Sequence, residues 1–179
     1  MTTRTITTIL AALLALAIVA PASATVGIDG GNWRQAAEPE FEITAYGNMR
    51  TSELWIAGRL PMDSNRTARS VVALTDRADI ERNLDMRVMA TDVNRDLAVF
   101  GIGPINMYAG TKGADDAMVL LTSHGTDVWL FVFVMPGLGA MDAEAVVAWT
   151  VETMVTGVAA TPGAGFVALT APLGEGSWA

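Results

Sequence analysis

His124 is the only histidine of the chain and lies close to Ser123 and Asp127, so the residue types of a nucleophilic triad occur together. Histidine is the side chain whose ordinary pKa lies nearest to neutrality, which suits it to acid-base catalysis. A catalytic triad, however, is assembled from segments that lie far apart in the sequence. Because neighbours this close cannot adopt triad geometry by themselves, we interpret His124 as a turn residue.

Asp92, Asn94 and Asp96 have the spacing of the first three calcium ligands of an EF-hand loop. The rest of that loop does not match, because Leu97 stands where Gly is needed and Gly103 stands where a bidentate Glu is needed. Asp and Asn are also frequent in tight turns. We therefore interpret 92–96 as a polar turn and assign no metal ligand, and Asp92, Asn94 and Asp96 are only the first candidates to test for a metal site. With one His and no Cys, zinc ligands of the usual kind are missing.

Two segments, Ser70–Asp76 and Met86–Phe100, resemble the part of HtrA-type trypsin-like proteases that carries the catalytic aspartate. The resemblance implies that role for Asp96. Such proteases need His, Asp and Ser in that order along the chain, whereas His124 follows Asp96 and no Gly-x-Ser-Gly-Gly segment is present. Proteolysis is therefore excluded, and the resemblance implies at most a strand-turn-strand unit, as in a catalytically inactive relative.

The fold must position these candidates, and its main signal is the apolar run Asp127–Met135. Gly125 precedes the run and Pro136 follows it, and its apolar side chains fall on both sides of an extended chain. This pattern predicts a central strand that is covered on both faces. A partner strand is predicted at Met118–Thr122, joined to the run by a hairpin over 123–126.

Residues Ala143–Thr156 are predicted to form a helix that Asp142 caps, with Glu144 in the first turn. Helical spacing places four apolar residues on one face, namely Val146, Val147, Val151 and Met154. The alternation of Trp149, Val151, Thr153 and Val155 is typical of a strand instead, so the sequence does not decide whether 142–156 is helix or strand.

Other elements follow from short apolar or β-branched runs and from Gly, Pro and Asx residues between them. We expect strands over residues 41–46, 53–60, 69–75, 86–91, 97–102 and 166–169, a short helix over 76–85, a turn at 47–48 and a loop over 104–116. The expected fold is one α+β domain, an antiparallel sheet of about five to seven strands with a central hairpin near 117–135 and one C-terminal helix over one face. An all-β fold is the alternative.

Residues 1–24 have the pattern of a secretory signal peptide, since Arg4 precedes an apolar segment and Ala22-Ser23-Ala24 follows Pro21. We therefore expect a secreted or periplasmic protein. The remaining chain is divided into a flexible arm (25–40), one globular domain (41–172) and a mobile tail (173–179).

The chain has a net charge of −8 and no cysteine. Nucleic acid is excluded as a partner, because phosphate binding needs a basic patch, and disulfides are excluded. We expect a non-catalytic binding domain for a protein, an envelope component or a small apolar ligand, with no cofactor and no membrane span once the leader is removed. The alternatives are an Asp/Glu hydrolase, which a divalent cation can assist, and a surface protein that assembles through strand edges.

For the hydrolase, Asp115 and Asp116 are available as paired acids, but adjacent acids in a loop are usually solvated. The sequence identifies no catalytic or cofactor-binding residue. It leaves open the ligand, the oligomeric state, the source, glycosylation at Asn65 in the sequon Asn65-Arg66-Thr67, and ordering of the tail on a partner.

Overall fold

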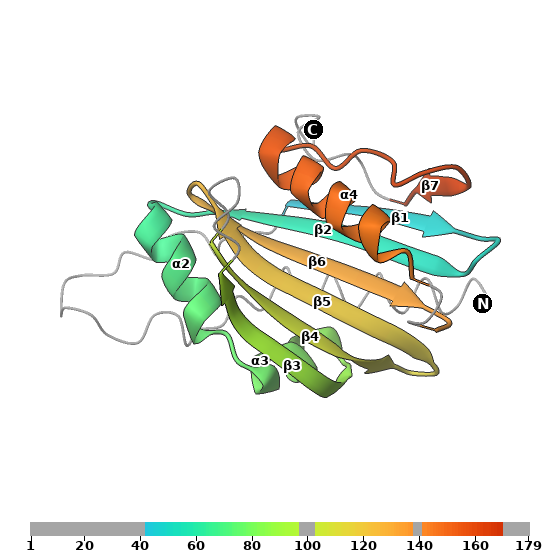
Figure 1. Cartoon of the computed structure of the whole chain (residues 1–179), viewed down its shortest axis with the longest axis horizontal. Helices are drawn as coiled ribbons and strands as arrows, with labels where there is room; N and C mark the ends of the chain where they lie inside the picture. The colour runs from blue at the N-terminus through green and yellow to red at the C-terminus, as the bar shows by residue number, and fades with distance from the viewer. Residues whose placement is uncertain (1–41, 97–102, 138–140, 170–179) are drawn as a thin grey trace, which may run out of the picture.

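A computed structural model describes residues 42–96, 103–137 and 141–169. Within these ranges the chain forms a single antiparallel sheet of seven strands, with three helices, and is mostly sheet (Figure 1). The elements in chain order are β1 (Glu42–Asn48), β2 (Glu53–Pro61), α2 (Asn65–Leu74), α3 (Arg77–Leu84), β3 (Arg87–Asp96), β4 (Pro104–Lys112), β5 (Asp115–His124), β6 (Asp127–Met135), α4 (Ala143–Thr156) and β7 (Phe166–Ala168). No helix in these ranges is long and apolar enough to cross a membrane.

Strand β6 lies in the middle of the sheet, whose order is β3-β4-β5-β6-β2-β1-β7. It pairs with β5 on one side and β2 on the other, so that Val132 lies opposite both Val119 and Ile56. Every residue of β6 after Asp127 is buried. The prediction of a central strand with both faces covered is therefore confirmed.

The hairpin of β5 and β6 is also confirmed, with longer strands and a tighter turn than expected. His124 and Asp127 form its last pair, so only Gly125 and Thr126 make the turn. Gly125 has a φ of 60°, which a two-residue hairpin turn of this kind requires and which glycine adopts without strain.

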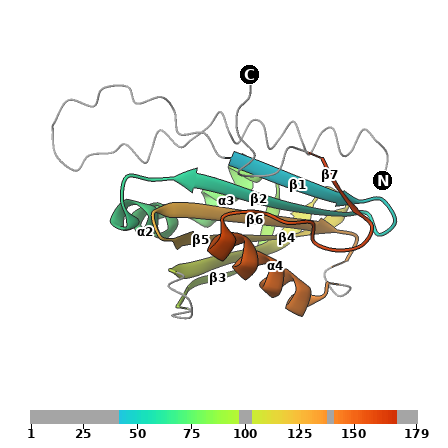
Figure 2. The same ribbon diagram turned by 90° about the horizontal axis from the view of Figure 1, so that it is seen from above.

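The two faces of the sheet carry two separate hydrophobic clusters. One contains Val128, Leu130, Val132 and Val134 of β6 together with buried residues of α2 and α3. The other is aromatic and contains Trp129, Phe131 and Phe133 together with Val146, Trp149 and Met154 of α4. Figure 2 shows α3 and α4 on opposite sides of the sheet.

Helix α2 corrects the strand expected over 69–75. Ser64 caps its first turn by accepting a hydrogen bond from the amide of Thr67. Ala68 and Val72 are buried four residues apart, which is a helical period. The β-branched pair Val71-Val72 favours a strand locally. The N-terminal cap and the packing of Ala68 and Val72 against β4, β5 and β6 stabilise a helix instead.

The short helix expected over 76–85 is confirmed as α3, and Ile80 and Leu84 are its buried residues. A reciprocal capping box of Asp76 and Asp79 begins the helix. Asp85 ends it in the left-handed conformation, with a φ of 48°.

The helix expected over 143–156 is confirmed as α4, capped by Asp142 and ended by Gly157 at a φ of 73°. Its buried face differs from the expected one. Val146 and Met154 are buried, whereas Val147 is 59% exposed. The inner face instead includes Trp149, Thr150 and Thr153.

Three expectations about irregular segments were wrong. The turn expected at 92–96 is the second half of strand β3, and the loop expected over 104–116 is strand β4 and the start of β5. Residues 47–48 end β1, and the turn follows them. The edge strand expected near 166–169 is confirmed as β7, and the strand expected at 97–102 lies outside the described residues.

Candidate functional site

The candidate metal ligands lie in β3, an edge strand of the sheet. Asp92 pairs with Met107 and Asp96 pairs with Pro104, with a register shift between Asp92 and Arg95. The side chains of Asn94 and Asp96 lie outside the described residues. Among the residues that the structure describes, no group of three or more His, Asp or Glu side chains is placed to hold a metal ion. Asp92, Asn94 and Asp96 stay candidates that only a metal-binding measurement can test.

Ser123, His124 and Asp127 do not form a triad. Ser123 and His124 are successive residues of β5, so their side chains point to opposite faces of the sheet. His124 and Asp127 are paired at the hairpin end. The same alternation separates Asp115 and Asp116, which begin β5. His124 and Asp127 therefore share a face and Ser123 points away from them, so the three residues of a triad do not converge, and neither do the two adjacent acids.

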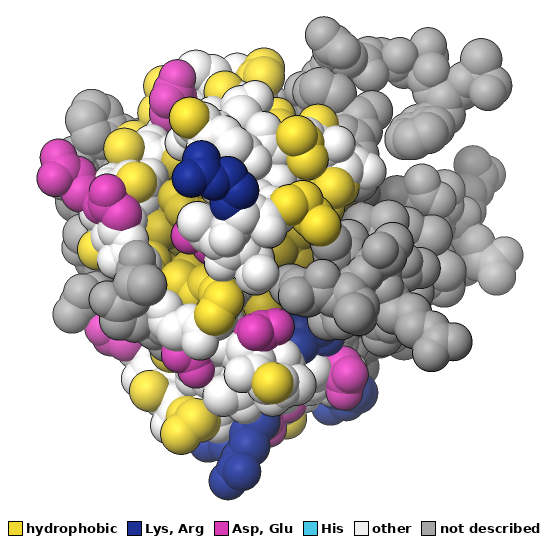
Figure 3. Space-filling model, turned by 90° about the vertical axis from the view of Figure 1, so that its right-hand side faces the viewer, with side chains coloured by type: hydrophobic (Ala, Val, Ile, Leu, Met, Phe, Trp, Pro, Cys, Tyr) yellow, Lys and Arg dark blue, Asp and Glu magenta, His cyan; other side chains and the backbone are white. Residues whose placement is uncertain are grey.

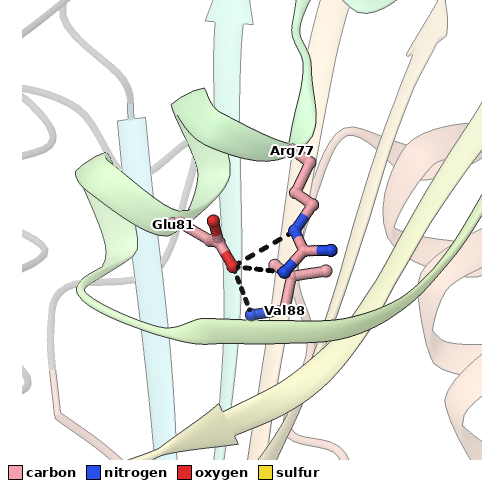
Figure 4. Close-up of polar contacts among 3 residues, drawn as sticks. All are labelled: Arg77, Glu81 and Val88. Carbon is pink, nitrogen blue, oxygen red and sulfur yellow. Dashed lines mark hydrogen bonds and ion pairs between the residues drawn. The ribbon is translucent and has the colours of Figure 1, made fainter.

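Glu81 is the centre of a polar contact between α3 and β3 (Figure 4). Its Oε1 accepts hydrogen bonds from Nε and Nη2 of Arg77, at 3.2 and 3.0 Å, and from the amide of Val88 at 3.0 Å. The hydrogen bond from Arg77 and then that from Val88 lower the pKa of Glu81. A general acid needs a raised pKa, so we assign Glu81 a structural role.

Lys112, the only lysine of the chain, contributes to the other end of α3. Its Nζ donates hydrogen bonds to the carbonyl of Leu84, the last residue of α3, and to the carbonyl of Asp85, the C-terminal cap of this helix. A cation near a helix C-terminus interacts favourably with the helix dipole. Burial lowers the pKa of Lys112.

A hollow of about 20 Å³ lies beside the turn between β1 and β2 and is lined by Asn48, Met49, Glu53 and Leu169, among others. Figure 3 shows this end of the molecule, where apolar side chains lie between isolated acidic and basic ones. The volume suffices for about one water molecule. It is far below the size of a pocket for a metabolite-sized ligand.

The aromatic cluster is centred on Trp149 of α4, whose ring lies 5.4 Å from Trp55, 5.8 Å from Phe131 and 6.0 Å from Phe133, in edge-on arrangements. The indole Nε1 of Trp149 donates a hydrogen bond of 2.7 Å to the carbonyl of Ala160. These contacts join the inner face of α4 to the sheet.

One end of this cluster is polar. The guanidinium of Arg59 lies 6.0 Å from the ring centre of Trp129 and pairs with Glu42 at 2.5 Å. Nearby in the same layer, three buried polar atoms have no hydrogen-bond partner, namely Nε1 of Trp129 and Oγ1 of Thr150 and Thr153. An unsatisfied buried group of this kind costs about 1–3 kcal/mol.

The outward side of α4 is apolar as well. Val147 and Val155 are 59% and 54% exposed. Val151 lies between them at a spacing of four residues and is only partly exposed, because it also packs against the aromatic cluster, and Ala148 is exposed beside it. We call these four residues the outer stripe of α4. Glu144 and Glu152 are exposed beside these residues, but contiguous exposed apolar residues mark interaction sites. The outer stripe is therefore the candidate functional site.

The sequence carries a signal for this surface that the periodicity of 143–156 did not reveal. No Lys or Arg follows Lys112, so α4 has the acids Glu144 and Glu152 and no base. An exposed helix normally carries charges of both signs along its solvent face. The missing cations distinguish α4 from an ordinary surface helix.

Comparisons with protein-family models, with curated proteins and with solved structures find no match for this chain.

Proposed function

We propose that the chain is an exported, non-catalytic domain that binds a protein through the outer stripe of α4. The observation that carries the proposal is the exposure of Val147 and Val155 on a helix whose inner face already packs in the aromatic cluster. Burying one such side chain against a partner contributes about 1.5–3 kcal/mol. A protein surface with a matching groove can therefore gain useful affinity from this stripe.

As part of the proposal, α4 is the cover of the aromatic face of the sheet, as the sequence predicts. The inner side chains Val146, Trp149 and Met154 hold it there. A helix fixed by a large ring such as Trp149 presents its opposite side as a firm surface. Such pre-organisation favours binding, because little conformational entropy is lost on association.

Two other functions have less support. A small apolar ligand needs a pocket of several hundred cubic ångströms, whereas the hollow beside the β1–β2 turn has about 20 Å³. A hydrolase needs converging carboxylates with a raised pKa, whereas the pKa of Glu81 is lowered.

The absence of native cysteine allows a direct test of the proposed surface. Single variants Val147→Cys and Val155→Cys place one thiol on the outer stripe, and Ala114→Cys places one on the exposed turn between β4 and β5. The rate of reaction with a maleimide is measured in the producing cells and on the purified, diluted protein. If a partner occupies about nine-tenths of the chains in cells, only about one-tenth of the thiols are free to react. We therefore expect labelling at positions 147 and 155 to be about tenfold slower in cells than in dilute solution.

Ala114→Cys is the matched control and should react at the same rate in both settings. Equal rates at positions 147 and 155 in cells and in dilute solution would show that nothing binds the outer stripe, and the proposed function would be wrong.

A further inference from the structure

The outer stripe of α4 has a chemistry that restricts its partner. The stripe is flanked by Glu144 and Glu152, both exposed, and the helix carries no Lys or Arg. A surface that fits it must therefore provide small or apolar side chains to receive the valines and basic side chains to pair with the acids.

The outer face of α2 in the same protein has this chemistry. Arg66, Arg69, Ser70 and Ala73 are all exposed and share one side of the helix, and α2 itself contains no Asp or Glu. The nearest acids in the sequence, Asp63 and Asp76, lie beyond the two ends of α2. We call these four exposed residues the outer face of α2.

The shapes of the two helices are also compatible. Ser70 and Ala73 are small, and the Ser70 hydroxyl is turned back onto the carbonyl of Arg66 at 2.9 Å. Small side chains on one helix leave a groove into which a ridge of larger side chains on another helix can pack. Val147, Val151 and Val155 form such a ridge, because they repeat every four residues.

We propose that the partner is a second copy of this chain, whose α2 outer face binds the outer stripe of α4. This inference rests on the proposed function. Helices α2 and α4 belong to the clusters on opposite faces of the sheet, so one copy can use both surfaces at once. Such a contact joins different surfaces of the two copies, and it repeats from copy to copy as an open chain or a closed ring.

Pairing of two α4 helices with each other is disfavoured by charge. In an antiparallel pair that crosses at Ala148, Glu144 of one copy lies near Glu152 of the other, because these residues are equally far from 148. Like charges placed opposite each other across an interface destabilise it.

Sedimentation velocity over a range of concentrations tests the contact. In the α4 variant, Val147→Lys and Val155→Lys add cations that repel Arg66 and Arg69, at exposed positions where lysine favours the helix. In the α2 variant, Arg69→Glu and Ala73→Glu add anions opposite Glu144 and Glu152. We expect the natural chain to form species that grow with concentration and each variant to be monomeric, with association weakened more than about tenfold.

Mixing identifies the arrangement. Each variant keeps one natural surface, so the intact α4 of the α2 variant should bind the intact α2 of the α4 variant, and the mixture should associate although neither variant does so alone. Arg50→Glu is the control, because it changes a charge at an exposed site on the β1–β2 turn, away from both helices. This variant should associate as the natural chain does. Circular dichroism of each variant shows whether it is folded.

A natural chain that stays monomeric would overturn the proposal, and so would an α2 variant that still associates. If the chain is monomeric but Val147→Cys is protected in cells, the outer stripe binds another protein and the proposed function stands. If the chain is monomeric and Val147→Cys is equally reactive in both settings, both proposals are wrong.

Discussion

The hydroxyl of Tyr46 donates a hydrogen bond of 2.7 Å to the carbonyl of Ala159, which is 113 residues away in the sequence. Tyr46 is in strand β1, and Ala159 follows the C-terminal end of α4. The bond is buried, and it joins an edge region of the sheet to the segment that connects α4 with β7. Together with the bond from Trp149 to Ala160, it fixes the path of the chain out of α4.

Replacing Tyr46 by Phe removes this hydrogen bond and keeps the ring. We expect the free energy of unfolding to fall by about 1 kcal/mol, because the Ala159 carbonyl loses its partner. Urea denaturation of the natural chain and of Tyr46→Phe measures the difference. Equal unfolding free energies would mean that the bond contributes nothing to stability.

Alkaline pH should destabilise the protein through its two tyrosines, Tyr46 and Tyr108. Burial raises the pKa of both hydroxyls above the ordinary value. Their contribution to stability is therefore complete below the unfolded pKa of about 10 and is lost as the pH rises through the folded pKa. Absorbance titration of tyrosinate should give a higher midpoint for the native chain than for the chain in urea. Coincident midpoints would contradict this prediction.

The sequence predicts the interior of the fold well, because a run of apolar residues that falls on both sides of an extended chain fits only a buried strand. The apolar run of β6 ends at the predicted residues, Asp127 and Met135. Helix α4 is also predicted with its bounds, since Asp142 and Gly157 mark its two ends. In β6 the local signals and the tertiary packing agree, whereas in α4 the strand-like alternation of residues 149–155 leaves a strand as the alternative that only the packing excludes.

The errors fall where local propensity and packing disagree. Val71-Val72 favours a strand, but burial of Ala68 and Val72 against the sheet selects a helix. In β4, Gly110 suggests a loop, but a Cβ there would lie too close to the backbone of Arg87 and Val88, so this glycine allows two strands to approach. Polar residues 92–96 suggest a turn, although polar residues are also acceptable in an edge strand.

The candidate site could not be predicted for a related reason. Helical periodicity identifies an apolar side but assumes that the other side is polar. In α4 the buried residues Val146 and Met154 and the exposed residues Val147 and Val155 are all apolar, so the sequence alone cannot distinguish the core from the surface. The position of Trp149 in the aromatic cluster makes that distinction.

Acid should weaken the connection between α3 and β3 at Glu81. Its pKa is lowered in the folded protein, so its contribution to stability is present above the unfolded pKa and is lost as the pH falls through the folded pKa. Glu81→Gln should be less stable than the natural chain at neutral pH, and the difference should shrink toward pH 3. Urea midpoints at several pH values measure this, with exposed Glu152→Gln as the control. A difference that does not depend on pH would be contrary to the prediction.

Alanine in place of Gly157 should destabilise the C-terminal end of α4. Gly157 has a φ of 73°, and this left-handed conformation costs a residue with a Cβ about 1–2 kcal/mol. The added Cβ would have only ordinary contact with Arg59, so we expect backbone strain alone. Gly137→Ala is the control, since a Cβ there meets nothing within 4 Å. Thermal unfolding of both variants gives the comparison, and equal melting temperatures would refute the assignment.

Calcium should not stabilise the protein if residues 92–96 keep the strand conformation. A ligand specific for the folded state adds about 2.7 kcal/mol at a hundred times its dissociation constant. Thermal unfolding with and without Ca²⁺, Mg²⁺ or Zn²⁺ is therefore a sensitive measurement, and we expect no shift. A shift that is abolished by Asp92→Ala or Asp96→Ala would instead support the metal site that the spacing of these residues suggests.

The absence of Lys and Arg after Lys112 has a practical consequence for anyone who digests this protein. Strands β5, β6 and β7 and helix α4 all lie beyond that residue. Trypsin, which cuts after Lys and Arg, therefore has no cleavage site in the hairpin, the aromatic helix or the last strand. Residues 113–179 therefore stay in one long tryptic peptide, and a standard digest gives mass spectrometry few peptides from these three strands and α4. A protease that cuts at acidic or aromatic residues is the better choice for mapping it.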